Sequence, residues 1–376
     1  MERYLDIVAP ALGARGDRVV MLARSVGPQR SDARAVPWSD EHDEPSVQAA
    51  AMVRAEIESL EPDAVVLHNV LDAGVVAAAR RASRMIYHLH DHRPTCPNGD
   101  RVYPRSGRRC SSPLGMSCLL HSALDGCMYG PRTRSLGLLR RRERLRDAIM
   151  TSDVVVANSP FVARRAAGSG ITGALPVELP LPDDAYVDGP PRAGDGTAIF
   201  VGRVEPQKGL RSLVRAIALL PAGSRIPLRV VGDGPDLEGC VAEAARRGVV
   251  LELFGRCDAN GVRAAIDASS VLVLPSLWDE PFGYVGIEAF ARGRPVCAYD
   301  VGGISWWLRD GQNGILVPPG DERGLAGALL AMLRDGPAEA GIGAACARLG
   351  VAARGDAEAY RHGPIVDRLR ALYAGA

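Results

Sequence analysis

Short apolar, β-branched runs alternate with amphipathic stretches along this chain, and that alternation constrains its fold more than any other feature. The amphipathic stretches lie at 46–60, 208–220, 235–247 and 322–334. Strands that are apolar throughout, with helices between them, indicate parallel sheets covered on both faces. The fold class is therefore α/β. The expected strands are 19–22, 64–68, 85–90, 154–157, 198–201, 228–231, 251–254, 271–274 and 296–298.

A proline-rich segment at 176–191 lacks a helical pattern and interrupts the alternation. The 376 residues are more than one domain usually holds. We therefore interpret this segment as a linker between two doubly wound, Rossmann-like domains that face a central cleft. The N-terminal domain is expected at 1–185 and the C-terminal domain at 192–352. Residues 353–376 are expected to form a helix that packs back on the N-terminal domain.

The overall charge and the hydropathy exclude several classes of protein. The 45 basic and 44 acidic residues leave a net charge of +1, so no nucleic-acid partner is expected. No apolar stretch is long enough to cross a membrane, and the N-terminal region lacks the apolar centre of a signal peptide. We therefore expect a cytoplasmic protein.

The strongest chemical signal is the run EPFGYVGIE at 280–288, which follows the apolar strand VLVL and opens a helix. Free N–H groups at a helix start favour an anion, so a phosphate is expected near residues 283–285. Glu288 lies in an apolar helical run, where a carboxylate needs hydrogen-bond donors such as ribose hydroxyls. The plainer alternative is a solvated loop acid at Glu280 and a partly exposed helix acid at Glu288.

A second signal is the run GRVEPQKGL at 202–210, directly after another apolar strand. Lys208 is the single lysine among the 45 basic residues, which suggests a site where a compact ammonium is required. Arg203 and Lys208 can converge on one diphosphate across this turn. The spacing is not that of a Walker A loop. A surface loop with two solvated cations is the plainer alternative.

Weaker signals lie at other predicted strand ends. Gly232 and the pair Gly255-Arg256 follow two strands and are expected to line the nucleotide pocket; alone, each is an ordinary glycine turn. His90-Asp91 follows the strand MIYHL in the first half. Histidines also stand at positions 88 and 92, so a purely local role for His90 is the plainer alternative.

These motifs together resemble glycosyltransferase family 4, a family of retaining, nucleotide-sugar-dependent enzymes with the two-domain GT-B fold. The shared pattern is FVGR-x4-KG, VVGDGP, LFG, PS-x3-EPFG-x4-EA-x2-G-x-PV and VGGI-x11-GILV. The resemblance covers nearly the whole chain and is most specific between about 197 and 335.

The resemblance implies a role for each matching residue. Arg203 and Lys208 would neutralise the donor diphosphate, Glu280 would contact a sugar hydroxyl, and Glu288 would hold the ribose. His90 would face the reacting sugar. The remaining donor-binding positions would be Gly202, Gly232, Gly255, Arg256, Phe282, Gly283, Tyr284 and Val285.

The resemblance further implies transfer of a hexose-type sugar from a UDP- or GDP-sugar to a hydroxyl acceptor, with retention of configuration. The acceptor could be a glycan, a lipid-linked sugar or a small metabolite. Fixed cations and a helix start would stabilise the departing diphosphate, and no Asp-x-Asp follows a predicted strand, so no catalytic cofactor or metal is expected. The alternatives are another GT-B enzyme, such as an epimerase or a phosphorylase, and a non-catalytic nucleotide-sugar-binding protein.

The chain departs from the family pattern at its start. Its first residues, MERYL, resemble the family's first helix, so the first strand and its glycine loop are expected to be missing. Our hypothesis is a misassigned start codon, with the true N-terminus upstream.

The segment 93–146 is a second departure, because it carries twelve arginines against three acids. We interpret it as an acceptor-side insertion that could attract an anionic acceptor or the inner membrane face. Its four cysteines lack the paired spacing of a strong zinc motif, so structural zinc, reduced thiols and a labile disulfide all stay open. These cysteines are Cys96, Cys110, Cys118 and Cys127.

Overall fold

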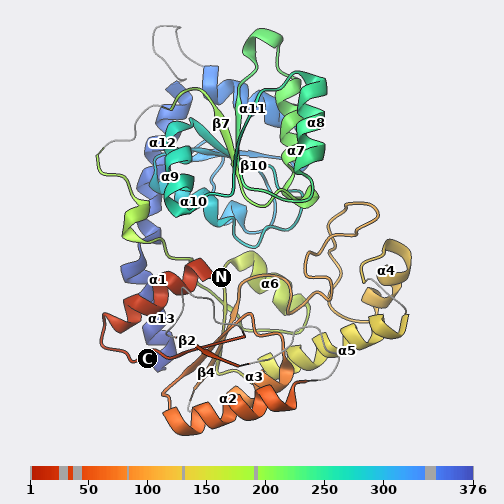
Figure 1. The fold of residues 1–376 in the computed structure, drawn as a ribbon, viewed down its shortest axis with the longest axis vertical. Coiled ribbons are helices and arrows are strands. Elements are labelled where there is room, and N and C mark those ends of the chain that lie inside the picture. The colour runs from red at the N-terminus through yellow and green to blue at the C-terminus, as the bar shows by residue number, and fades with distance from the viewer. Residues whose placement is uncertain are drawn as a thin grey trace. The chain divides into compact units, whose positions relative to one another are not determined.

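The computed structural model of the protein describes residues 2–24, 33–36, 45–82, 84–128, 132–189, 194–334 and 344–375. The chain divides into two units (Figure 1): residues 1–180 with 362–376, and residues 181–361. The chain therefore passes from the first unit to the second at Leu181, before the expected domain limit at 185, and returns to the first unit at His362. The main-chain N–H of Leu181 donates to the carbonyl of Tyr360 at 2.7 Å. This hydrogen bond joins the first and the last segment of the second unit.

The described residues of the first unit form two parallel sheets. Strands β1 (Met21–Ala23) and β2 (Ala33–Ala35) form one, and the other has the order β3-β4-β5-β6. The registers of this second sheet place His68 opposite His88. Two short strands, β2 and β6, were not predicted, and β1 begins two residues later and ends one residue later than expected. The strands of the larger sheet are β3 (Val65–His68), β4 (Met85–Leu89), β5 (Val154–Ala157) and β6 (Leu175–Pro176).

Helices of the first unit bury two apolar layers against the larger sheet. One layer joins α1 (Glu2–Gly13) and α13 (His362–Ala374), with Tyr4, Val8 and Leu369 packed on Ile86 and Val156. The final helix thus belongs to the first unit, although the preceding residues up to Arg361 belong to the second. The other layer includes residues of α2 (Val47–Leu60), α3 (Ala73–Ala79), α5 (Arg132–Ile149) and α6 (Pro160–Gly168). The segment between β4 and α5 carries one further helix, α4 (Ser117–Asp125).

The second unit has one parallel sheet with the order β12-β11-β10-β7-β8-β9. Strands β10 and β11 are buried along their whole length, as the uninterrupted apolar runs predicted. Only β12 was absent from the predicted strands. The bounds are β7 (Ala198–Val201), β8 (Leu228–Val231), β9 (Leu251–Gly255), β10 (Val271–Leu274), β11 (Val296–Tyr299) and β12 (Gly314–Val317).

Helices lie on both sides of this sheet (Figure 1), so the doubly wound α/β prediction is confirmed for the described residues. Helix α7 packs against α8 and α11, and α10 packs against α12. The main helices are α7 (Leu210–Ala218), α8 (Leu237–Arg247), α9 (Ala259–Ala268), α10 (Tyr284–Ala291), α11 (Glu322–Arg334) and α12 (Ala344–Ala357). Short 3-10 turns lie at η1 (Asp183–Ala185), η2 (Pro206–Lys208), η3 (Ala222–Ser224), η4 (Ile304–Trp306) and η5 (Glu358–Tyr360).

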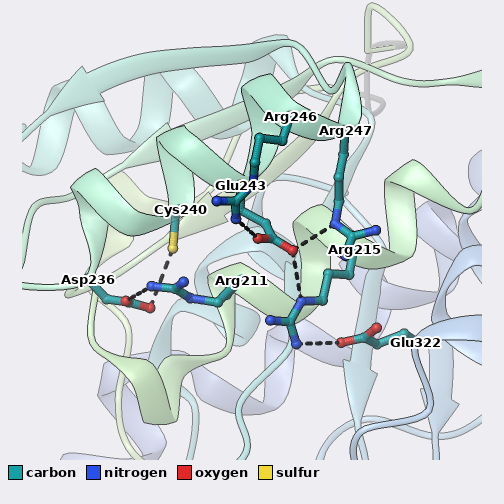
Figure 2. Close-up of polar contacts among 8 residues, drawn as sticks. All are labelled: Arg211, Arg215, Asp236, Cys240, Glu243, Arg246, Arg247 and Glu322. Carbon is teal, nitrogen blue, oxygen red and sulfur yellow. Dashed lines mark hydrogen bonds and ion pairs between the residues drawn. The ribbon is translucent and has the colours of Figure 1, made fainter.

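A network of ion pairs joins α7, α8 and α11 on the outside of the second unit (Figure 2). The carboxylate of Glu243 accepts from Arg215 at 3.1 Å, from Arg247 at 2.7 Å, and from Arg246. These guanidinium donors lower the pKa of Glu243 to about 2. Charged contacts therefore help to hold α7 against α8.

Of the helices within the described ranges, none combines the length and the apolar character that a membrane crossing needs.

Candidate active site

Three glycine turns meet at the carboxyl edge of the second unit's sheet. The N–H of Gly202 donates to the carbonyl of Val231 at 3.0 Å, and the N–H of Gly232 donates to that of Gly255 at 2.7 Å. Gly232 has φ 138°, and a Cβ added there would overlap the carbonyl oxygen of Gly202. Because only glycine allows this approach, the loops after β7 and β8 lie in direct contact, and the end of β9 joins them through the carbonyl of Gly255.

Lys208 and Glu280 form an ion pair at the centre of this edge. The ammonium Nζ lies 2.8 Å from Glu280 Oε2. The same oxygen accepts from the hydroxyl of Ser276 at 3.0 Å and from the indole N–H of Trp278 at 2.9 Å. The ammonium also lies 4.9 Å from the centre of the Trp278 ring. The reading of Glu280 as a solvated loop acid is therefore wrong, since only 12% of its side chain is exposed.

Backbone geometry brings this lysine inward. The 3-10 turn η2 is followed by Gly209, whose φ of 75° suits glycine. A Cβ on Gly209 would overlap the carbonyl of Pro275, so the loop after β7 lies directly against the loop after β10. These two strands are neighbours in the sheet. The strand order thus places Lys208 beside Glu280.

Electrostatics keep the pair charged. Burial tends to raise the pKa of Glu280, but the Lys208 charge and the hydrogen bonds from Lys208, Trp278 and Ser276 outweigh it and hold the pKa below its usual value. All the side-chain hydrogen bonds that Glu280 makes within the described residues end on Oε2. Its other oxygen, Oε1, is therefore available to accept from a ligand.

Arg203 does not share this partner. Its side chain is 71% exposed and pairs with Glu205 at 2.8 Å. Arg203 and Lys208 therefore do not converge: Arg203 pairs with Glu205, whereas Lys208 pairs with Glu280. Arg256 is likewise exposed, one residue after Gly255.

The N-terminus of α10 follows Glu280 directly along the chain, at Tyr284. Gly283 precedes the helix with φ 82°, and the half-buried Tyr284 and Val285 begin it. The carbonyl of Phe282 accepts from the Trp307 indole N–H at 2.6 Å, which fixes the turn. Glu288 is only 6% exposed, so the reading as a partly exposed acid is wrong.

His90 lies in the first unit within a cluster of aromatic rings. His68 Nδ1 and His90 Nε2 are 2.9 Å apart, and His88 Nε2 lies 3.0 Å from the Tyr373 hydroxyl. The ring of Tyr4 packs against all three histidines. Burial is the main reason that the pKa of each histidine is lowered, to about 3 for His68. The three imidazoles are therefore neutral at pH 7.

These three histidines also form a candidate metal cluster. One ring nitrogen from each lies within 4.8 Å of the others. The sequence predicted neither His68 nor Tyr4 as part of this region. The available signal was that 64–68 and 85–90 are consecutive predicted strands, whose ends meet when they pair in parallel. His92 lies elsewhere, against Phe161.

Ser276 and Trp278 were also missed as side chains that hold the candidate carboxylate. Both belong to the loop that leads to Glu280, and Ser276 stands in the quoted PS motif. A hydroxyl and an indole N–H a few residues before a buried acid are plausible donors. Nothing in the sequence, however, says that they reach the same oxygen as Lys208.

Two family models match the chain. Residues 1–175 match the model described as Glycosyltransferase Family 4, and residues 195–335 match that described as Glycosyl transferases group 1. A phosphatidyl-myo-inositol mannosyltransferase of Mycobacterium leprae is 38% identical over 149 residues, which are 39% of this chain and 39% of that protein. The chain thus spans about two fifths of the length of this curated relative.

Solved structures agree on the fold. A glycosyltransferase from Rickettsia africae superposes with a TM-score of 0.73 at 16% identity, over 100% of this chain and 94% of that one. Anabaena HepE in complex with UDP-glucose gives 0.64 at 19% identity, over 88% and 82%. The solved structures show the GT-B fold, and the two family models, which together cover most of the chain, show that the chain is a glycosyltransferase of the family 4 type.

Proposed function

We propose that this protein transfers a hexose-type sugar from a UDP- or GDP-sugar to a hydroxyl acceptor, with retention of configuration and without a catalytic metal. The observation that carries the proposal is the geometry of Glu280, which holds the Lys208 ammonium through Oε2 and keeps Oε1 available. A cation therefore lies beside a carboxylate oxygen that can accept a hydrogen bond from a sugar hydroxyl. A donor sugar attached to a diphosphate needs both.

The charge changes of the reaction match this arrangement. As the sugar–phosphate bond breaks, positive charge grows on the sugar ring and negative charge on the leaving diphosphate. The ammonium of Lys208 would stabilise that negative charge, and the N–H groups at the start of α10 would add to it. Arg203 would turn from Glu205 toward the diphosphate when a donor binds. These fixed charges need no metal ion in the step.

The remaining residues would hold the donor and the reacting sugar. The buried Glu288 would accept hydrogen bonds from the ribose hydroxyls, and the turn at Gly255-Arg256 would contact the base. Gly202 and Gly232 would let the backbone approach the phosphates. Neutral His90 would face the sugar. The acceptor would be the hydroxyl of a glycan, a lipid-linked sugar or a small metabolite.

Two relatives indicate which donors to test first. The mycobacterial relative is named a mannosyltransferase, and HepE was solved with UDP-glucose. These names concern those proteins, and for this chain they guide only the choice of donors to test.

The test is incubation of the purified protein with UDP- and GDP-hexoses, with release of UDP or GDP as the readout. We expect slow hydrolysis of one donor without acceptor, persistence of that activity after EDTA treatment, and loss in Lys208→Met. Proton NMR of the released sugar, at early times, should show the donor's anomeric configuration. Tight binding of a donor with no turnover of any would overturn the transferase and favour a nucleotide-sugar-binding protein.

A further inference from the structure

The cysteines of the segment 93–146 are free thiols, each of them half-buried: Cys96, Cys110, Cys118 and Cys127. Among the described residues, the side chains close enough together to hold a metal ion are His68, His88 and His90, and not these cysteines. The feature of the segment that points to a partner is instead its helix, α4.

Helix α4 exposes large apolar side chains. Met116, at its N-cap, is 72% exposed, Leu120 is 57% exposed and Leu124 is 60% exposed. The three residues stand four positions apart, so they lie along one side of the helix and form what we call the α4 stripe. A surface helix of a globular protein normally buries its apolar side against the core. Helix α4 does the reverse.

Polar side chains of α4 are held by the rest of the first unit. Tyr103, in the hairpin of residues 102–109, packs on His121 with the ring centres 4.6 Å apart, and its hydroxyl lies 3.2 Å from His121 Nε2. The hydroxyl of Ser122 lies 2.9 Å from that of Ser135 in α5, the helix beside α4 in Figure 1. These contacts fix which side of α4 faces the protein, so the stripe is exposed because of the way the helix docks.

Arginines lie next to the α4 stripe. The hairpin carries three exposed ones: Arg105, Arg108 and Arg109. The guanidinium of Arg105 donates to the carbonyl of Leu124 at 2.7 Å, which places one cation at the end of the stripe. In α5, the exposed Arg134 directly precedes the serine that contacts α4. Positive charge therefore accompanies the exposed apolar side chains.

The stretch of chain that forms this surface is almost free of acids. Residues 101–140 contain seven arginines and one acid, Asp125. The carboxylate of Asp125 is paired with His121 Nδ1 at 2.8 Å. Exposed apolar side chains beside unopposed positive charge suit the surface of an anionic bilayer, where apolar groups enter the acyl boundary and arginines meet lipid phosphates.

We propose that α4 docks this protein on an anionic lipid bilayer, with the α4 stripe inserted at the boundary between headgroups and acyl chains. The arginines of the hairpin and of α5 would bind the lipid phosphates. A helix of 9 residues inserts little apolar surface, so the attachment would be reversible. A second copy of this chain is a poorer occupant, because a two-fold contact would place the same arginines against one another. The inference does not depend on which donor or acceptor the protein uses.

The first test is sedimentation of the full-length protein with lipid vesicles. One set consists of phosphatidylcholine alone, and the other of phosphatidylcholine and phosphatidylglycerol at about two to one. We expect binding to the mixed vesicles, at least about 10-fold weaker binding to the neutral ones, and weaker binding at about 1 M salt, which screens the charges. Equal binding to both sets, or binding to neither, would overturn the proposal.

Variants assign the binding to α4, and each has a matched control in the second unit. Leu120→Gln should weaken binding to the mixed vesicles roughly 10-fold, whereas Leu219→Gln, at a leucine that is 50% exposed, should not. Arg108→Gln should weaken it about 5-fold, whereas Arg323→Gln, at an exposed arginine of α11, should not. All four side chains are exposed, so the urea unfolding midpoints should stay unchanged. An unchanged affinity in Leu120→Gln would overturn the proposal.

Two further measurements distinguish the bilayer from other occupants. Hydrogen exchange with mixed vesicles present should slow in residues 116–125, and slowing confined to other segments would contradict docking through α4. Sedimentation velocity without lipid should show the same oligomeric state for the unmodified protein and Leu120→Gln. A dimer that dissociates in this variant would place a second copy on the stripe and overturn the proposal. None of these readouts is sugar transfer, so failure here is distinguishable from failure of the proposed function.

Discussion

Lys208 Nζ lies 2.8 Å from Glu280 Oε2, although the two residues are 72 positions apart. The contact exists because β7 and β10 are neighbours in the sheet and their following loops touch at Gly209 and Pro275. The lysine and the carboxylate hold each other in an orientation that a bound diphosphate sugar would use. Under the proposed function, turnover and local stability would therefore depend on the same pair.

Replacing Lys208 should affect both properties. Lys208→Met should lower kcat at least about 100-fold, because it removes the charge that would stabilise the leaving group. It should also destabilise the second unit, because Glu280 would be left partly buried without its cation. Steady-state kinetics and urea unfolding measure the two effects.

The double variant Lys208→Met with Glu280→Gln separates them. It should recover much of the lost stability, since no uncompensated charge remains, but none of the activity. Recovery of activity in the double variant would show that the lysine acts only by neutralising Glu280.

Glu288 should matter for nucleotide affinity more than for turnover. Glu288→Gln keeps the shape of this buried side chain but weakens acceptance from two ribose hydroxyls. We expect the Kd for UDP or GDP to rise about 10-fold, measured by calorimetry. Glu238→Gln, an exposed acid on α8, is the control. Equal affinities in Glu288→Gln and the unmodified protein would refute the ribose assignment.

Stability should fall as the pH is lowered below about 6.5, the pKa of histidine in an unfolded chain. His68, His88 and His90 have pKa values below that in the folded state, about 3 for His68, so the unfolded chain binds protons that the folded one does not. Each such histidine adds a slope of up to about 1.4 kcal/mol per pH unit. Urea unfolding between pH 7 and 5 should show this loss, and a smaller one in His68→Asn. An identical slope in the variant would contradict the assignment.

The turn at Gly232 should not tolerate a side chain. Gly232→Ala places a Cβ on the carbonyl of Gly202 at a φ that alanine rarely adopts, and we expect a loss of about 2 kcal/mol or more. Gly223→Ala, at an exposed glycine with open space around its Cα, should change stability by less than about 0.5 kcal/mol. Equal unfolding midpoints for the two variants would show that the close approach is not required.

The ion-pair network in Figure 2 should make the second unit sensitive to acid. The pKa of Glu243 is lowered to about 2 by Arg247, Arg215 and Arg246, so its stabilising effect is complete above about pH 4.5 and is lost as the pH falls toward 2. Glu243→Gln should therefore lower the melting temperature at pH 7, and the difference from the unmodified protein should shrink at pH 3. A constant difference across this range would argue against the network.

Local sequence determined the elements and the kinds of residue at their ends. The apolar runs predicted most strands of both units because a strand buried on both faces must be apolar along its length. The candidate site was predicted from the glycines at the ends of β7, β8 and β9, from the run at 280–288 and from the single lysine. These residues could be recognised because the chemistry of each follows from its own type and its place after a strand. The short strands β2 and β6 were not predicted because two or three residues are too few to show a hydrophobic periodicity.

Tertiary structure decided which of these ends meet. The order β12-β11-β10-β7-β8-β9 makes β7 and β10 neighbours, and the pairing of β3 with β4 joins His68 to His88 and His90. Such pairings depend on how the whole core packs, which no single stretch of sequence encodes.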